Sequence, residues 1–102
     1  METIKLENFL KDMGIDMPSK GKILELFYET AEYFPEGDFP YEFVDEVEQR
    51  GDGQGYETFW VFQRKSDGKY FCYYSYDGRV EEWELMETTK KVVVQWDFER
   101  QY

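Results

Sequence analysis

The sequence predicts an α+β fold: two N-terminal helices followed by a four- to five-stranded antiparallel β-meander, in a single domain that spans residues 1–102. Two observations support this prediction. Apolar residues recur with a helical period of about 3.6 as far as Phe34, and with a period of about 2 after Pro40. Asp-Gly pairs then separate runs of aromatic and β-branched residues, which is the pattern of β-hairpins. Helices followed by a run of strands indicate an α+β domain.

The first third of the chain is predicted to be helical. Its first helix places apolar side chains at the i, i+3, i+4 and i+7 positions and ends at Gly14, a suitable C-cap. A second helix is predicted from Ser19, an N-cap residue, to Phe34, because Pro35 disfavours a helical conformation of the residue before it. The apolar positions of the first helix are Leu6, Phe9, Leu10 and Met13.

The second predicted helix is amphipathic. Its apolar side chains share one face of a helical wheel, and carboxylates spaced 4, 3 and 4 residues apart occupy the opposite face. We therefore expect one side of this helix to pack on the sheet and the other to face solvent. The apolar face comprises Ile23, Leu24, Phe27, Ala31 and Phe34, and the acidic face comprises Glu25, Glu29, Glu32 and Glu36.

The predicted strands follow from side chains that alternate between two faces. Runs at 59–64, 70–75, 80–86 and 92–98 have this alternation or are rich in β-branched residues, and Asp67-Gly68 and Asp77-Gly78 interrupt them as turns. The stretch Tyr41–Gln49 is interpreted as a further strand, paired through the glycine-rich segment 51–55. A short acidic helix is the alternative for this stretch.

Composition excludes several classes of function. The chain has 12 Lys and Arg against 23 Asp and Glu, a formal net charge of -11, whereas binding to phosphate backbones or anionic lipid relies on cationic side chains. The single cysteine, Cys72, excludes an intramolecular disulfide and is expected in the core. The chain has no histidine, the commonest metal ligand and general base. We therefore expect a non-enzymatic protein with no catalytic residues, no metal site and no cofactor.

The sequence also bears on location. The N-terminus alternates charged and apolar residues and lacks the apolar core of a secretion signal. The longest aliphatic run, Val92 to Val94, is far shorter than the ~20 residues of a membrane helix. A cytoplasmic location is expected.

The excess of negative charge is concentrated in one third of the chain. Residues 25–57 hold 11 acidic residues and one basic residue, whereas segments 1–24 and 58–102 are close to neutral. Repulsion between carboxylates on neighbouring helical turns costs a few tenths of a kcal/mol per pair, so this crowding suggests a role other than folding. Three interpretations remain: a solvated face that keeps a small domain soluble, a docking surface for a cationic protein, and a divalent-cation site without EF-hand spacing.

Tyrosines provide a second candidate surface. Four of them fall on both faces of one predicted strand. Since one face must pack under the helices, we expect Tyr70, Tyr74 and Tyr76, or their counterparts, to lie near solvent. Tyrosine is enriched in binding hot spots. The alternative is a sheet face that is half-covered by its own aromatic residues.

The resulting hypothesis is an acidic protein-binding domain that inhibits a cationic protein, such as a nuclease, a guided effector or a DNA-binding protein, by mimicking nucleic acid in an anti-CRISPR-like or immunity-type role. The alternative is an assembly subunit of a phage or mobile element that self-associates, as a homodimer for example, through its Tyr-rich sheet. No direct contact with nucleic acid or membrane is expected. The predicted partner-binding residues are Glu25, Glu29, Glu32, Glu36, Glu42, Asp45, Glu46, Tyr70, Tyr74 and Tyr76.

Overall fold

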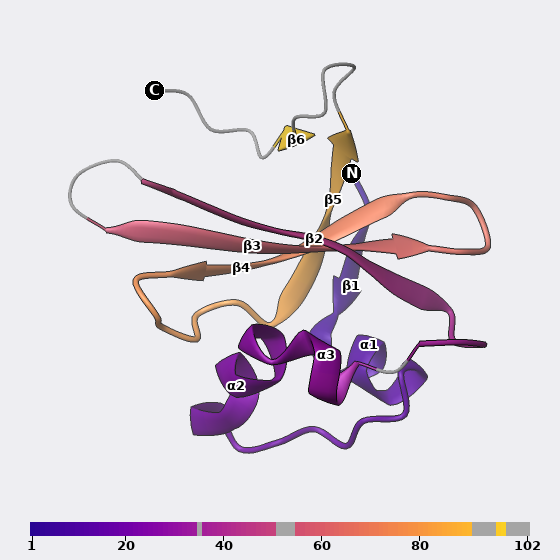
Figure 1. The fold of residues 1–102 in the computed structure, drawn as a ribbon, viewed down its shortest axis with the longest axis horizontal. Helices are drawn as coiled ribbons and strands as arrows, with labels where there is room; N and C mark the ends of the chain where they lie inside the picture. Colours follow the sequence, from indigo (N-terminus) through magenta and orange to yellow (C-terminus); the bar gives the residue numbers. More distant parts are fainter. Residues whose placement is uncertain (35, 51–54, 91–95, 98–102) are drawn as a thin grey trace.

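The computed structural model of the chain describes residues 1–34, 36–50, 55–90 and 96–97 (Figure 1). It confirms the α+β fold, with helices near the N-terminus followed by an antiparallel meander. The elements are β1 (Thr3–Lys5), α1 (Leu6–Asp12), the 3-10 turn η1 (Lys20–Lys22), α2 (Ile23–Tyr28), α3 (Thr30–Tyr33), β2 (Tyr41–Arg50), β3 (Tyr56–Arg64), β4 (Tyr70–Tyr76), β5 (Glu84–Lys90) and β6 (Trp96–Asp97).

The strands form an antiparallel sheet in the order β1-β5-β4-β3-β2, and β6 pairs with β5. Strands β2 to β5 are neighbours in both sequence and space, as in a meander. The helices α1, α2 and α3 lie together on one side of this sheet (Figure 1). That side is the helix-facing side, and the other is the outer face. Among the described strands, β2 therefore forms one edge of the sheet.

The main core lies between the helices and the helix-facing side. The Phe27 ring of α2 stacks on Tyr73 of β4, with ring centroids 4.2 Å apart and an interplanar angle of 7°. Phe9 of α1 meets Phe62 of β3 edge-on at 4.9 Å. All four side chains are completely buried. Aromatic pairs in these geometries stabilise a core beyond the area that they bury.

The second predicted helix has the expected bounds, but the prediction of one continuous helix is wrong. The Ser19–Phe34 segment begins with η1, and its helix is interrupted at Glu29, which has φ -110° and ψ 46°. Two residues seven apart on a straight helix are about 10 Å apart along its axis. The interruption lets the ring centroids of Phe27 and Phe34 approach to 5.3 Å, so both rings enter one core. Ala31 is exposed, contrary to its predicted place on the apolar face, and Leu26 is buried instead.

The strands differ from the prediction at two places, and a third prediction is largely untested. Residues Thr3–Lys5 form a strand that pairs with β5, although the first third of the chain was predicted to be helical. The predicted strand 80–86 begins only at Glu84, because the backbone just before it bonds elsewhere: the Tyr73 hydroxyl donates to the Glu82 carbonyl at 2.9 Å. The predicted strand 92–98 falls largely outside the described residues, which include only β6 from it. The prediction for Tyr41–Gln49 is confirmed, because this stretch is in β2.

One arginine fastens the N-terminus to the sheet. The Arg64 guanidinium donates to both carboxylate oxygens of Glu2, at 2.6 and 2.8 Å, and to Asp67 Oδ2 at 2.7 Å. It also lies over the Phe71 ring, 4.8 Å from its centroid. The hydrogen bonds and charge of Arg64 lower the pKa of Glu2 and lower that of Asp67 to about 2. Both carboxyl groups are therefore held in their ionised form.

This arrangement predicts a pH dependence of stability. Because the pKa values of Glu2 and Asp67 are lowered on folding, these groups stabilise the fold above their unfolded values near pH 4. This stabilisation is lost as the pH falls through the folded-state pKa values, about 2 in the case of Asp67. We expect Arg64→Met to reduce this acid-induced loss, measured by urea unfolding between about pH 6 and pH 2. Arg79→Met is the control, since Arg79 makes looser ion pairs at 3.8 and 3.9 Å. Equal pH slopes in wild type and Arg64→Met would contradict the prediction.

Candidate functional site

The carboxylates of the helical segment face solvent. Glu25 lies on α2, Glu29 between α2 and α3, and Glu32 on α3, and all three are exposed. Tyr28 lies among them in the sequence and is 47% exposed. The Tyr33 hydroxyl donates to Glu25 Oε1 at 3.2 Å, and this hydrogen bond together with the charge of Glu25 raises the pKa of Tyr33. The helix thus presents an acidic surface that includes an exposed aromatic ring.

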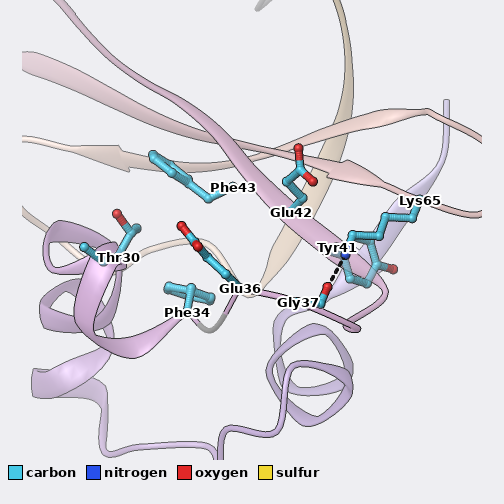
Figure 2. A pocket seen from close by; sticks show the side chains of 9 residues that line it. Thr30, Phe34, Glu36, Gly37, Tyr41, Glu42, Phe43 and Lys65 are labelled. Carbon is cyan, nitrogen blue, oxygen red and sulfur yellow. Dashed lines mark hydrogen bonds between the residues drawn. The ribbon is translucent and has the colours of Figure 1, made fainter.

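A pocket separates α3 from the start of β2 (Figure 2). The Glu36 carboxylate lies on the side of the pocket where Thr30 and Phe43 lie, whereas the Glu42 carboxylate points away from the helices. The Lys65 ammonium donates to the backbone carbonyl of Gly37. The pocket is therefore lined both by the acidic helical segment and by the edge strand. Its lining residues are Thr30, Ala31, Phe34, Glu36, Gly37, Tyr41, Glu42, Phe43 and Lys65.

A β-bulge divides the acidic residues of β2 between the two faces of the sheet. The pairing of β2 with β3 shifts between Phe43 and Asp45. After the shift Glu46 is opposite Trp60, whose side chain belongs to the core beneath the helices. Residues directly opposite each other in an antiparallel pair share a face. Glu46 therefore lies on the helix-facing side, while Asp45, opposite Val61, lies on the outer face together with Glu42.

Trp60 links Glu46 to the acidic helix. Its indole N–H donates to Glu46 Oε1 at 2.7 Å, and its ring meets Tyr28 of α2 edge-on with centroids 5.0 Å apart. The hydrogen bond orients the exposed carboxylate of Glu46, and a carboxylate has further lone pairs available to a partner. The two acidic segments thus meet through one indole ring. We define the helix-side acidic surface as Glu25, Glu29, Glu32, Glu36 and Glu46.

The three predicted tyrosines of β4 lie on the outer face of the sheet, away from the helix-side acidic surface. Since Tyr73 stacks under α2, the alternation of β4 places Tyr74 and the other two predicted tyrosines on the outer face. Tyr70 and Tyr74 pack against the cluster of Phe59, Val61 and Cys72, and Tyr74 donates to Glu57 Oε2 at 3.0 Å. The ten predicted residues therefore divide into two groups. The outer-face group is Glu42, Asp45, Tyr70, Tyr74 and Tyr76.

The basic residues that form salt bridges do so with carboxylates outside the helix-side acidic surface. The salt bridges of the described residues join Arg64 to Glu2 and Asp67, Lys69 to Glu2, and Arg79 to Asp77 and Glu81. None of these carboxylates belongs to the helix-side acidic surface. Within the part of the chain that the structure describes, that surface is not neutralised by ion pairs.

Two exposed aromatic residues were not predicted as part of the site. Tyr28 is 47% exposed and lies in sequence among the carboxylates of α2 and α3, and Phe43, 37% exposed, lines the pocket. The helical wheel contains the signal for Tyr28, because Glu25 and Glu32 are its i−3 and i+4 neighbours. The exposure of Phe43 depends on how β2 meets α3, which no local pattern specifies.

The single cysteine and the acidic side chains are the groups that bear on covalent and metal chemistry. Cys72 is buried, as expected, and burial raises the pKa of its thiol to about 12, so the nucleophilic thiolate is scarce near neutral pH. In the described ranges no three His, Cys, Asp or Glu side chains group closely enough to bind a metal ion. Nor does any described helix have the length and apolar character needed to span a membrane.

Comparisons with protein families, curated proteins and solved structures find no match.

Proposed function

We propose that this chain is a non-enzymatic acidic domain that binds a cationic, nucleic-acid-acting protein and competes with nucleic acid for it. One observation carries this proposal: the exposed carboxylates of the helix-side acidic surface are not ion-paired with any described lysine or arginine. Complementary charge accelerates the encounter of two proteins and selects partners of opposite sign.

Carboxylates can replace phosphates in such a complex. A protein that binds nucleic acid presents lysines and arginines to a regular row of negative charge. Glu25, Glu29 and Glu32 offer negative charges along one helical segment, and Glu46 extends them onto the sheet. Tyr28 and Phe43 add exposed aromatic rings, which are enriched in binding hot spots. Inhibition of this kind requires occupancy of the cationic surface and no chemical step.

Competition tests the proposal directly. A labelled DNA duplex is titrated with each of several basic nucleases and DNA-binding proteins, with and without excess domain, and its fluorescence anisotropy is recorded. For a true partner, we expect the domain to weaken DNA binding about tenfold or more at low salt, and less as salt rises. Unchanged DNA affinity for every protein tested, at every salt concentration, would refute the proposal for this class of partner.

A further inference from the structure

The edge strand β2 is the longest of the described strands, and β3 is its only partner among them. An edge strand carries backbone N–H and C=O groups that no neighbouring strand satisfies. The bulge between Phe43 and Asp45 leaves Asp45–Arg50 as a regular segment beyond it. This segment could therefore pair with one more strand.

Hydrogen bonds at the end of β3 show which backbone groups of β2 face the open edge. Arg64 N donates to Lys69 O towards β4, whereas Lys65 N donates to Pro40 O on the β2 side. Because bonding direction alternates along a strand, the odd-numbered residues of β3 bond to β2.

The same alternation assigns the residues of β2. Val47 and Gln49 lie opposite Phe59 and Glu57, two odd-numbered residues of β3, and so bond inward. The backbone N–H and C=O groups of Glu46 and Glu48 therefore point away from the sheet.

The side chains of the edge favour a cationic occupant. Glu46 and Glu48 are both exposed and lie on the helix-facing side, and Val47 lies between them on the outer face. Trp60 already orients the Glu46 carboxylate. A second copy of this chain paired through the same strand would bring like charges together, which destabilises cross-strand pairs.

We propose that the Asp45–Arg50 edge binds an extended, cationic segment of the partner as an added antiparallel strand. Lysine or arginine at alternate positions would lie opposite Glu46 and Glu48, with a β-branched residue opposite Val47. Backbone hydrogen bonds supply affinity in this mode of recognition, and the alternating side chains supply specificity. This inference rests on the proposed function for the cationic class of the partner.

A capped synthetic peptide of alternating lysine and valine provides the probe. Its control has the same composition with all lysines at one end. We expect the alternating peptide to bind at low salt, to shift the β2 amide resonances in NMR spectra, and to bind at least about fivefold more tightly than the control. Equal binding of the two peptides, or shifts confined to the helices, would overturn the inference.

Two substitutions of Glu48 distinguish the contribution of its backbone N–H to peptide binding from that of its carboxylate. Glu48→Thr removes the carboxylate but keeps the outward N–H, whereas Glu48→Pro removes both without breaking a bond to β3. We expect Glu48→Thr to weaken peptide binding a few-fold and Glu48→Pro to weaken it about tenfold more. Equal binding by the two folded variants would overturn the inference.

If Glu48→Pro does not fold, peptides that are N-methylated on their backbone amides still test whether backbone hydrogen bonds to β2 are needed for binding. N-methylation at alternate amides should abolish binding in one register and spare it in the other, because only one set of N–H groups faces β2. Equal effects in both registers would overturn the inference. A salt-insensitive dimer in sedimentation that protects the β2 amides would also overturn it, since a second copy would then occupy the edge.

The peptide experiment and the competition experiment fail separately. If the domain competes with DNA but neither peptide binds, the added-strand mode is wrong and the proposed function stands. If the alternating peptide binds through β2 but no DNA-binding protein is displaced, the edge recognises cationic strands and the proposed function is wrong.

Discussion

Phe27→Ala is expected to lower the free energy of unfolding by ~3–5 kcal/mol, the usual cost of emptying a large aromatic site in a core. Phe27 is completely buried. Its ring stacks on Tyr73 at 4.2 Å and also lies 5.3 Å from Phe34 and 5.4 Å from Trp60, between ring centroids. Truncation therefore removes contacts to helix and sheet at once.

Urea unfolding followed by circular dichroism measures this loss. Tyr28→Ala is the matched control, because Tyr28 is the next residue of the same helix, has a similar ring and is 47% exposed. We expect its free-energy loss to be well under half that of Phe27→Ala, since an exposed ring leaves no buried cavity. A loss below about 1 kcal/mol for Phe27→Ala would show that this ring does not hold α2 on the sheet.

The strands β2 to β4 could be predicted because their signals are local. Alternation defines each strand, and the turns contain residues that tolerate positive φ. Gly68 has φ 76°, and Asp77 and Gly78 have φ 53° and 71°. The predicted Tyr41–Gln49 strand differs from the observed Tyr41–Arg50 by one residue. In these segments the predicted and observed bounds of the strands agree closely.

The elements that were predicted wrongly depend on tertiary contacts that a local sequence pattern does not show. The helix is interrupted at Glu29, and this interruption allows the rings of Phe27 and Phe34 to share one core. The strand β1 has three residues, too few to show a period, and it forms by pairing with β5. A strand of that length is stabilised by its partner and not by its own sequence.

The candidate site was predictable on the helix and not on the strand. A helical wheel places Glu25 and Glu29 on the exposed face, and the structure agrees. Strict alternation along β2 would place Glu42 and Glu46 on the same face. The bulge between Phe43 and Asp45 reverses the alternation and puts these two carboxylates on opposite faces. One inserted residue thus separates charges that the sequence pattern places together.

Simultaneous replacement of Glu25, Glu29 and Glu32 by lysine is expected to slow association with a cationic partner about tenfold or more at low salt. Charge reversal turns long-range attraction into repulsion along the helix, and steered association depends strongly on such charges. All three side chains are exposed, so the fold should persist. Stopped-flow mixing with a DNA-binding protein identified by competition measures the association rate as salt is raised.

The matched control places the same added charge on a different segment. Glu7, Asp12 and Asp16 are also exposed, and they belong to the first 24 residues, which carry no net charge. Their replacement by lysine changes the total charge equally, but near 0.1 M salt it should slow association much less, because at that salt concentration the field of a charge weakens within about 10 Å. Equal slowing by the two triple variants would assign the effect to total charge and contradict a steering role for the helix-side acidic surface. An unchanged rate in both variants would contradict steering altogether.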